Sequence, residues 1–412
     1  MYYKTRLLAS MHQAQGILVF TGKQRKRIMD KLLVVAYVFA ALSAFSYVLV
    51  MVLLTIGFLR HQKPSNIVPS NTKPFVSIVV AARNESACIK SLLDSLVEQH
   101  YPIHLLEILV VDDHSTDATR VLASSYQRVK LIELTGEGIG FGKKAALKEG
   151  VRQSIGQVLL FTDADCVMGP DWVASMVESL QNSKASFVGG AVVLDGHTGV
   201  FSQLQQLEFV SLMASTVGSI ALGYPLMANG ANYAITRAAW DSTASMAQGQ
   251  QQASGDDMFL MLAIQKLHGR NSVVFNANRA ALVSTSVKPT FAENFQQRAR
   301  WVSKSGQYSQ PWVIITGVIV ALLNALIIGF LGIGVFMQEL LLCSLLLFGL
   351  KTIIDFPIMM LAASKFRKAR LMLNYLLLQL VYPAYVLISI TWGHLNQLKW
   401  KGRDIDDKGR FS

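Results

Sequence analysis

The sequence contains few cysteines and few charged residues. Its three cysteines, Cys88, Cys166 and Cys343, are scattered along 412 residues, and none belongs to a CxxC pair. This argues against a disulfide framework or a zinc site and suits a reducing compartment. Charged residues make up only 16% of the chain, whereas a soluble globular protein usually carries about 25%. Together with a hydrophobic fraction of 52%, this deficit excludes a disordered chain and an ordinary soluble one.

Signatures of nucleic-acid binding are also missing. The net charge of +12 at pH 7 could indicate a nucleic-acid partner, but the sequence has no helix-turn-helix, zinc-finger or RNA-binding pattern. We therefore expect no nucleic acid among the partners. The basic residues of membrane proteins gather beside anionic lipid on the cytoplasmic face, so membrane lipid is the partner that this charge indicates.

Long apolar runs are what the sequence does contain. Residues 32–59 carry no charge, and a run of this length spans a bilayer once with some residues to spare. It is too long for a secretory signal, and no small-residue cleavage site follows it. The segment 1–31 before it is more basic than the linker 60–73 after it, so the positive-inside rule would place the residues after the run outside. A translation start at Met29 would reverse this bias, and we hold that start as a hypothesis.

Further apolar segments begin near residue 312. Residues 312–336 and 340–363 are each long enough to span a bilayer, and residues 372–394 form another apolar segment, which Pro383 interrupts. We therefore expect about three transmembrane segments within residues 312–394.

Two details of this C-terminal region bear on topology and function. Lys351 and Asp355 are four residues apart on one helical face, so they are predicted to pair inside the bundle. A transport role is the alternative for such a pair. The loop 364–370 and the tail 395–412 are both basic, which favours a cytoplasmic position for both. If all three segments crossed the membrane in turn, the loop and the tail would lie on opposite sides of it. A re-entrant segment at Pro383 or a split of the second span at Lys351 would place both on the same side.

The middle of the chain is predicted to be an α/β domain over residues 74–288. After the polar linker, apolar strands are expected at 75–82, 105–111 and 158–162, with helical patterns between them. Strands that are apolar along their whole length indicate a parallel sheet buried on both faces. Strands that alternate with helices indicate a doubly wound α/β sheet. Each strand ends in polar residues, and such sheets bind ligands at the carboxyl ends of their strands.

Acidic residues follow two of these strands. Asp163 and Asp165 lie two apart after a buried strand, so both carboxylates can face one centre. Hard oxygen ligands of this kind suit Mg²⁺ or Mn²⁺ on a diphosphate, and a capped turn is the structural alternative. Asp112 and Asp113 end the preceding strand, where they would either accept hydrogen bonds from a ribose or a base or cap the next helix.

Three further motifs have both a functional and a structural interpretation. The segment 138–144 combines glycines with lysines before a helix, which suits a phosphate or a flexible loop. Asp256 and Asp257 open an apolar helix, where a carboxylate either caps the helix or acts as a general base. The segment 289–311 contains QRARW at 297–301. Arg pairs with phosphate and Trp stacks on a sugar, whereas a basic and aromatic belt at a membrane edge is the alternative.

Taken in order, these motifs resemble a known family. ARNE, VDDHSTD, GKKAALKEG, DAD, GDD and QRARW follow one another as in membrane-embedded glycosyltransferase family 2 enzymes. These include cellulose, hyaluronan and poly-N-acetylglucosamine synthases and the chitin-oligosaccharide synthase of nodulating bacteria. The resemblance covers about residues 74–310. It implies an α/β GT-A type catalytic domain with flanking transmembrane helices, a UDP-sugar donor and Mg²⁺ or Mn²⁺ as cofactor. It also implies an inner (plasma) membrane location with the catalytic domain in the cytoplasm.

The resemblance implies a role for each motif residue. The residues expected to bind the nucleotide sugar are Ala82, Glu85, Asp112, Asp113, Lys143, Gln297 and Arg300. Asp163 and Asp165 would hold the metal. Asp257 would be the catalytic base, and Asp256 would be its acidic neighbour. The residues expected near the acceptor are Trp301, Asn229, Gly230 and Asn232.

These roles imply an inverting transfer. Asp257 would take the proton of an acceptor hydroxyl, whose oxygen attacks the anomeric carbon from the face opposite the nucleotide. The metal and Arg300 would stabilise the leaving diphosphate, and no second nucleophile for a retaining route is found. We expect a polysaccharide or a lipid-linked molecule as acceptor. The chain has fewer C-terminal spans than a cellulose-type pore, so transfer of one or a few sugars to a lipid such as a carotenoid stays open.

Two other protein classes fit parts of the sequence. A membrane scaffold or transporter with a nucleotide-binding α/β domain would explain Lys351 and Asp355. Against it, the metal motif, the base and QxxRW are all intact, which favours an enzyme. A soluble nucleotidyltransferase has a similar sheet, but no glycine-rich nucleotide-binding signature opens the first strand here. The sequence therefore favours a membrane-bound glycosyltransferase without naming its donor sugar.

Overall fold

The computed structural model describes most of the chain, namely residues 22–61, 72–134, 141–196, 198–247, 256–303, 308–395, 398–400 and 403–405. Several predicted features lie partly outside the described residues. These are the N-terminal segment (1–21), the linker (62–71), the glycine and lysine segment (135–140), part of the α/β domain before Asp256 (248–255) and the end of the basic tail (406–412). The backbone of Asp256 is described, but its side chain is not.

The α/β domain is built on a mixed sheet of seven strands. In spatial order these are β3 (Val129–Glu133), β2 (Leu106–Asp112), β1 (Val76–Ala82), β4 (Val158–Asp163), β8 (Tyr233–Thr236), β6 (Phe187–Gly190) and β9 (Val273–Asn276). The first four run parallel, and β1 is almost wholly buried, as its apolar sequence predicted. The sequence did not reveal β8, which runs antiparallel to both β4 and β6. The sheet is therefore mixed rather than wholly parallel.

A smaller sheet and six helices complete this domain. The small sheet contains β5 (Cys166–Met168), β10 (Val283–Ser286) and β7 (Val192–Asp195) in that order. The helices are α3 (Ile89–Val97), α4 (Thr119–Ser124), α5 (Lys143–Gln153), α6 (Trp172–Ser183), α8 (Arg237–Ala247) and α9 (Asp256–His268). The buried side chains of the sheets and of these helices belong to one continuous apolar core.

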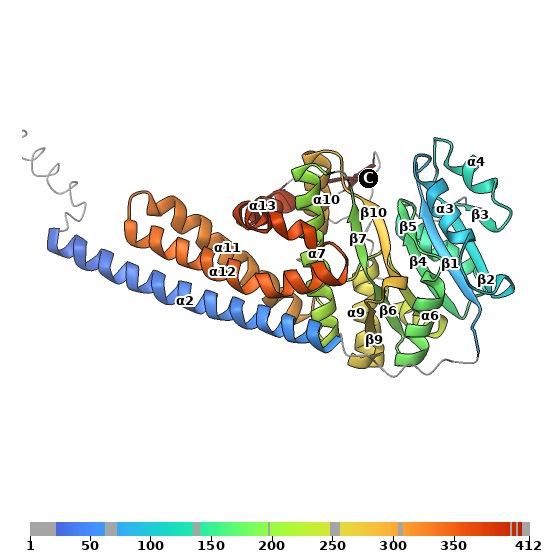
Figure 1. Cartoon of the computed structure of the whole chain (residues 1–412), viewed down its shortest axis with the longest axis horizontal. Coiled ribbons are helices and arrows are strands. Elements are labelled where there is room, and N and C mark those ends of the chain that lie inside the picture. The colour runs from blue at the N-terminus through green and yellow to red at the C-terminus, as the bar shows by residue number, and fades with distance from the viewer. Residues whose placement is uncertain are drawn as a thin grey trace, which may run out of the picture.

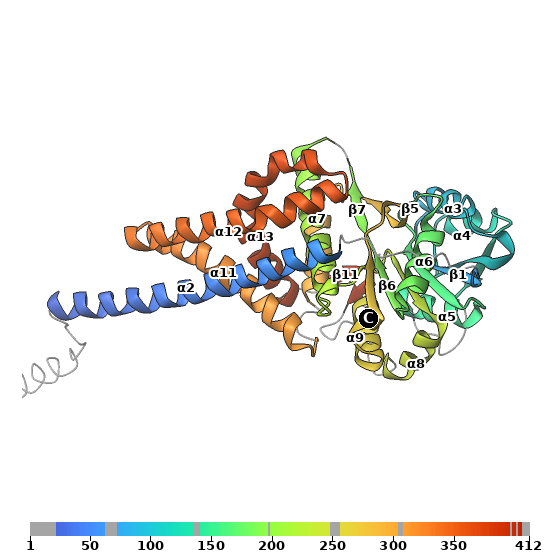
Figure 2. The same ribbon diagram turned by 60° about the horizontal axis from the view of Figure 1, so that its bottom comes forward.

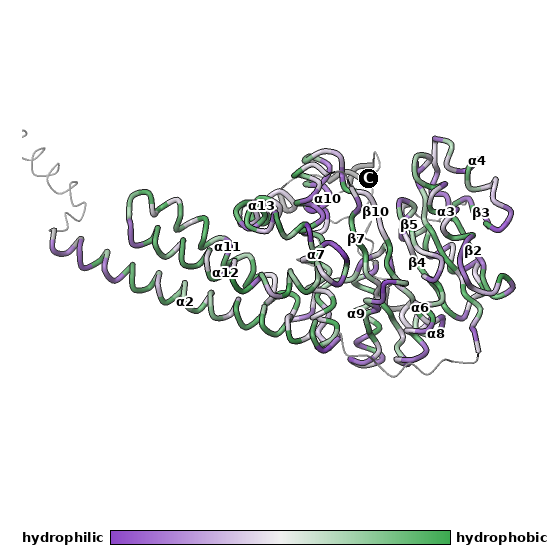
Figure 3. Tube along the Cα trace, viewed as in Figure 1, coloured by the Kyte–Doolittle hydropathy of each residue, from purple (hydrophilic) through white to green (hydrophobic). Residues whose placement is uncertain are grey.

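The other helices lie on one side of this domain. They are α2 (Gly22–His61), α7 (Val200–Ala221), α10 (Phe291–Val302), α11 (Pro311–Gly334), α12 (Gln338–Lys365) and α13 (Tyr375–Leu395). Figure 1 shows α2, α11 and α12 side by side, pointing away from the sheets, and they contact one another. Figure 3 shows that these helices are hydrophobic along most of their length. Helix α2 begins before the apolar run, and its first turns, within 23–31, are exposed and polar.

Four segments of the described chain are long and apolar enough to cross a membrane, namely Lys26–His61, Pro311–Gly334, Gln338–Lys365 and Ala369–Gly393. The protein is therefore membrane-associated.

The last of these segments differs from the others in direction. Figures 1 and 2 show that α13 does not accompany α11 and α12 to their far turn but crosses toward α10. Its Tyr385 accepts a hydrogen bond from Asn294 of α10 at 3.2 Å, and the strand after it, β11 (Leu398–Trp400), also contacts α10.

This arrangement bears on the two devices that the sequence offered for the topology. Helix α12 is unbroken at Lys351, and α13 continues through Pro383, so neither a split nor a break occurs there. Because α13 crosses the bundle, the chain returns to the domain side, where β11 pairs with β12 (Arg403–Ile405). The basic loop 364–370 and the start of the basic tail thus lie on the same side, as their charge favoured.

The predicted ion pair inside the bundle is confirmed. Lys351 Nζ lies 2.8 Å from Asp355 Oδ2 and donates to Gln379 Oε1 at 2.6 Å. Tyr47 of α2 donates to the other carboxylate oxygen of Asp355 at 2.8 Å. The pair is thus tied to two neighbouring helices, as a structural interpretation requires.

Helix α7 joins the bundle to the domain by packing closely against α2 near Gly218. A Cβ built at Gly218 would overlap the backbone carbonyl of Leu54, and one built at Gly57 would overlap that of Gly218. Small residues allow such close helix crossings.

We expect Gly218→Ala to destabilise the protein by about 1–3 kcal/mol, the usual cost of overpacking a filled site. Thermal unfolding in detergent would measure this as a lower Tm. Gly349→Ala is the matched control, because a Cβ at Gly349 meets no atom within 4 Å. An equal Tm for both variants would contradict the close crossing.

Candidate active site

The carboxyl ends of three neighbouring strands place the acidic motifs together. In the register of the sheet, Ala82 of β1 pairs with Asp112 of β2, and Ala81 pairs with Asp163 of β4. Parallel strands that end at the same level present the residues after them along one edge. The two acidic motifs, 50 residues or more apart in the chain, therefore meet at one edge because the strands pair in register.

Asp112 and Asp113 have different surroundings. The Oδ2 atom of Asp113 accepts a hydrogen bond from the backbone N–H of Gly142 at 3.1 Å, and its side chain lines a large cavity. Asp112 does not line that cavity, and its Oδ2 accepts from the backbone N–H of Ser115 at 3.0 Å. Asp112 thus stabilises the turn that carries Asp113, and its expected role in supporting the nucleotide stays a prediction.

Residues from four motifs converge on one point of this cavity. Lys143, the first residue of α5, forms an ion pair with Asp163. A Cβ built at Gly230 would lie 3.1 Å from Lys143 Nζ and 3.3 Å from Asp257 Oδ2. Gly230 thus leaves room between the ammonium of Lys143 and the carboxylate of Asp257. The structure brings together the lysine, the first metal-motif carboxylate, the acceptor-loop glycine and the expected base.

Asp163 and Asp165 fit a hard divalent cation. Their side chains are 37% and 36% exposed, both line the cavity, and both lie near an ammonium group. The partner of Asp165 is Lys288, at 3.8 Å, which the sequence did not single out. The described residues hold no group of three or more metal-ligating side chains. These two carboxylates would therefore share the cation with oxygens of a ligand, as Mg²⁺ does with substrate phosphates.

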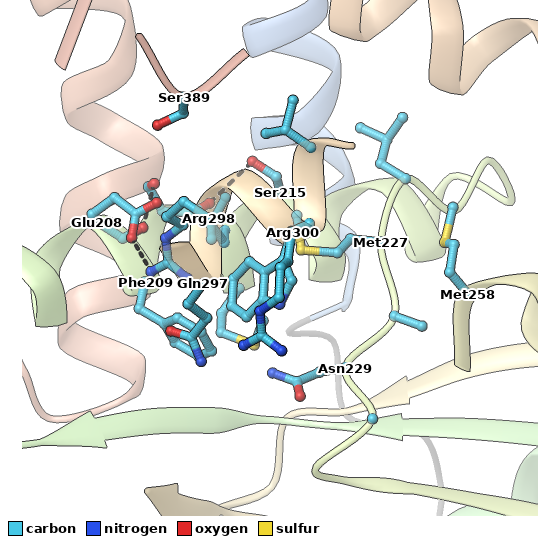
Figure 4. A pocket seen from close by; sticks show the side chains of 18 of the residues that line it. Glu208, Phe209, Ser215, Met227, Asn229, Met258, Gln297, Arg298, Arg300 and Ser389 are labelled. Atoms are coloured by element: carbon cyan, nitrogen blue, oxygen red, sulfur yellow. Dashed lines mark hydrogen bonds and ion pairs between the residues drawn. The ribbon is translucent and has the colours of Figure 1, made fainter. Parts of the chain in front are cut away.

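Helix α10 carries the predicted QRARW motif along the cavity. The hydroxyl of Thr290 caps the helix by accepting from the N–H of Glu293 at 3.2 Å. Gln297, Arg300 and Trp301 all line the cavity. Figure 4 shows the guanidinium of Arg300 pointing toward Asn229. Burial lowers the pKa of the Arg300 guanidinium, and the nearby charge of Asp163 opposes this effect.

Arg298, between the motif residues, was not predicted as a site residue. It is only 4% exposed and forms an ion pair with Glu208 of α7. Its guanidinium lies 4.3 Å from the ring centroid of Trp301, so it helps to fix the indole expected near the acceptor. Nothing in the sequence indicated that Glu208 is the partner of Arg298, because the two residues are 90 positions apart.

The three residues expected near the acceptor between β6 and α8 do not share one role. Asn229 and Gly230 line the cavity, but Asn232 does not. Asn232 is fully buried: its Oδ1 accepts from Trp172 Nε1 at 2.9 Å, and its Nδ2 donates to the carbonyls of Ala191 and Ala281 at 2.8 Å. All of these partners belong to the protein, so the prediction that Asn232 contacts the acceptor is wrong.

We expect Asn232→Ala to act on stability. It removes the three hydrogen bonds of a buried amide, and leaving such partners unsatisfied costs about 1–3 kcal/mol. Circular dichroism during heating should show a clear drop in Tm, whereas Asn229→Ala, at the cavity wall, should keep the wild-type Tm. Equal Tm values for both variants would restore Asn232 as a candidate for acceptor binding.

One cavity of about 1440 Å³ contains these groups. Its domain end is lined by Ala82, Arg83, Glu85 and Asp113, and its other end continues between the apolar helices to Lys351. Tyr308 also lines it, and burial together with the charge of Asp257 raises the pKa of its hydroxyl. Among the described residues, the cavity thus combines anionic ligands for a cation, cationic side chains and an apolar extension.

The fold is similar to that of a solved glycosyltransferase. The chain is similar to the solved structure of a mannosyltransferase from Pyrobaculum calidifontis in complex with GDP-Man and Mn2+, with a TM-score of 0.54 and 20% sequence identity. The superposition covers 87% of this chain and 99% of that one. The α/β domain therefore has the GT-A glycosyltransferase fold, and apolar helices flank it.

The sequence comparison points to the same class of enzyme. Residues 77–243 match the family model "Glycosyl transferase family 2". The chain is 33% identical over 151 residues to "Glycosyltransferase AglE" of Haloferax volcanii. The aligned region covers 34% of this chain and 50% of that protein. It is also 34% identical over 119 residues to "Beta-monoglucosyldiacylglycerol synthase" of Nostoc sp.. That aligned region covers 28% of this chain and 25% of that protein. The chain thus spans half or less of the length of these relatives.

Proposed function

We propose that this protein is an inverting glycosyltransferase that moves a sugar from a UDP-sugar to a polysaccharide or lipid acceptor at a membrane. The observation that carries this proposal is the single cavity that holds Asp163, Lys143, Asp257 and Arg300 and then continues between the apolar helices. A donor with a diphosphate fits the domain end, and an acceptor from the lipid phase fits the helical end.

Each side chain would have a distinct task at the donor. Asp163 and Asp165 would hold Mg²⁺ or Mn²⁺, which supplies positive charge to the leaving diphosphate. Lys143 and Arg300 would add fixed cationic charge on the same groups. Ala82, Glu85 and Asp113, at the strand ends, would hold the nucleoside, and Gln297 would reach the diphosphate from α10. The ion pair between Lys143 and Asp163 would then rearrange when the donor binds.

Asp257 would act as the general base on the acceptor. It lies across from Lys143 at Gly230, so its carboxylate faces the place where the diphosphate-bearing sugar would sit. Asp257 would accept the proton of the acceptor hydroxyl as the oxygen attacks the anomeric carbon. One base and one in-line displacement invert the anomeric configuration. Asn229 and Trp301, both on the cavity wall, would contact the acceptor.

We also propose that the protein lies in the inner (plasma) membrane with the GT-A domain in the cytoplasm. Both the basic loop 364–370 and the start of the basic tail lie on the domain side of α11 and α12, which supports this orientation. Activated sugar donors are then available to the domain directly.

The first test is nucleotide release by the detergent-purified protein. UDP-sugars, with GDP-Man as a comparison, would be supplied with Mn²⁺, Mg²⁺ or EDTA, together with a lipid extract as acceptor source. The proposal expects metal-dependent release of nucleotide from one donor, and the product's anomeric configuration by NMR to be opposite to that of the donor. A retained configuration, or binding of every donor without release, would contradict it.

A further inference from the structure

Helix α13 covers only about half of the length of the helix bundle. Its first residue, Tyr375, donates to the carbonyl of Thr352 at 2.5 Å, and Gln379 accepts from Lys351 at 2.6 Å. Both partners lie at the middle of α12 (Gln338–Lys365). The 21 residues of α13 make a helix of about 31 Å, as long as the hydrocarbon layer of a bilayer is thick. Because α13 starts at the middle of α12 and ends at α10, it must lie at a steep angle to α11 and α12, as Figures 1 and 2 show.

The far end of α13 packs directly on α10, the helix that carries the QRARW motif. A Cβ built at Gly393 would lie 2.7 Å from the carbonyl oxygen of Ala299, so the backbones of the two helices touch there, as small residues allow. Ala299 is fully buried and stands between Arg298 and Arg300 in the motif. The contact therefore lies directly behind the side chains that α10 presents to the cavity.

Two side-chain contacts of α13 hold the first turns of α10. Tyr385 accepts the hydrogen bond of Asn294 at 3.2 Å, and the ring centroid of Trp392 lies 5.7 Å from that of Phe295. Together with the backbone contact at Gly393, they attach α13 to α10 from its beginning to its motif. Helix α10 thus lies between α13 and the cavity that its motif residues line.

The side of α13 that faces away from the protein is apolar. The exposed residues of α13 lie at helical spacing on one face. They are Leu376, Leu377, Leu380, Val381, Ile388, Thr391 and Trp392. This face continues that of α12, because the ring of Phe356, which is 43% exposed, lies 5.4 Å from that of Tyr375. An apolar face that is continuous with the exposed faces of the other apolar helices indicates contact with lipid.

Basic residues stand before this apolar face. Lys365, Arg367 and Arg370 are exposed at the end of α12 and in the loop that leads to α13. Cations beside an apolar helix face suit a membrane surface with anionic headgroups, where such a helix lies with its apolar side about 5–10 Å deep. The charge and the apolar face therefore both fit the membrane leaflet that is nearer to the GT-A domain.

We propose that α13 does not cross the membrane but lies along the leaflet on the domain side, where it holds α10 in its position at the cavity. Its apolar face contacts acyl chains, and its close contact at Gly393 keeps the motif of α10 in place. Gly393 is thus a positioning residue for Arg300. The location of α13 is independent of the proposed function, whereas its effect on binding of a nucleotide sugar rests on that function.

Side-specific labelling tests whether α13 crosses the membrane. In a full-length protein without the native cysteines, Ser412→Cys, Val121→Cys or Phe336→Cys would meet a membrane-impermeant maleimide in sealed vesicles of one orientation. Val121 lies on α4 of the GT-A domain and Phe336 at the far turn between α11 and α12, and they are 71% and 88% exposed. We expect Ser412→Cys to react together with Val121→Cys. A reaction together with Phe336→Cys would show that α13 crosses the membrane and would overturn the inference.

A spin label tests what covers the outer face of α13. Leu380 is 63% exposed, and a nitroxide attached to Leu380→Cys collides with dissolved oxygen in lipid but with a water-soluble nickel complex in water. We expect oxygen to dominate at Leu380→Cys and the nickel complex to dominate at the control, Val121→Cys. Dominance of the nickel complex at Leu380→Cys would indicate solvent, and exclusion of both reagents would indicate a protein partner. Either result overturns the inference.

Gly393→Ala tests the link between α13 and the site. The added methyl group would press on the backbone of Ala299 and displace α10, so the Kd for the UDP-sugar should rise at least tenfold in calorimetric titration. Gly332→Ala on α11 is the matched control, because a Cβ at Gly332 meets no atom within 4 Å, and it should keep the wild-type Kd.

A positioning role differs from a purely structural one in this measurement. A purely structural role would lower the Tm of Gly393→Ala but leave the Kd of the folded protein unchanged, so a wild-type Kd in a protein that circular dichroism shows to be folded would contradict the positioning role. A wild-type protein that binds no nucleotide sugar would count against the proposed function, and the two labelling experiments would still decide the location of α13.

Discussion

Replacing Asp257 with Asn is expected to reduce kcat for sugar transfer by about 10²–10⁴-fold, the usual contribution of a general base. The amide has the shape of the carboxylate but cannot accept the hydroxyl proton. Because Asp257 faces the space at Gly230 rather than the nucleoside end of the cavity, the Kd for the nucleotide sugar should stay near its wild-type value. Initial rates with a labelled donor, together with calorimetric titration of the donor, would measure both quantities.

Asp241→Asn is the control for this substitution, since Asp241 is an exposed carboxylate on α8. It should leave both kcat and Kd unchanged. If Asp257→Asn kept its full rate, another residue would have to be the base. If it lost donor binding as strongly as rate, Asp257 would be a donor ligand and not a base.

Removing the metal or one of its carboxylates is expected to have the second large effect. Chelation with EDTA should abolish sugar transfer. Asp165→Asn should weaken Mn²⁺ binding in the presence of UDP by at least about 10–100-fold, because even the loss of a side chain that only supports a metal ligand has an effect of this size. Asp163 and Asp165 are the carboxylates available, since the described residues contain no larger ligand group. Electron paramagnetic resonance of Mn²⁺ measures this binding without any turnover.

Asp171→Asn is the matched control for the metal variant. Asp171 is a 60% exposed carboxylate paired with His100 and does not line the cavity. Its Mn²⁺ binding should equal that of the wild type. Mn²⁺ binding by Asp165→Asn at wild-type affinity would show that the cation is held elsewhere.

The local features of the GT-A domain could be predicted from the sequence. The apolar runs of β1, β2 and β4 matched the observed strands within about one residue, because strands buried on both faces have a distinct composition. Polar residues at the ends of parallel strands then follow the general rule for such sheets. For this reason Asp113 and Asp163 were found as candidates before their contacts were known, whereas Asp257 was found because it belongs to an acidic pair that opens an apolar helix.

Other parts of the site depended on residues far apart in the chain. The antiparallel strand β8, the Glu208–Arg298 pair and the contact of Lys288 with Asp165 each join segments that carry no local signal of one another. For Asn232, by contrast, the sequence suggested a ligand contact where the structure shows a structural role. Its place in a polar loop suggested ligand contact, but three buried hydrogen bonds use its amide.

The sequence by itself determined the apolar helices, the strand ends and the acidic motifs, because hydrophobic periodicity and strand composition are local properties. Only the tertiary structure decided that α13 crosses toward α10 and returns the tail to the domain side. It also decided that the domain end of the cavity and its apolar extension are continuous. Both results depend on how α7, α10 and α13 pack against one another, and packing between distant segments is set by shape and charge in three dimensions rather than by any single stretch of sequence.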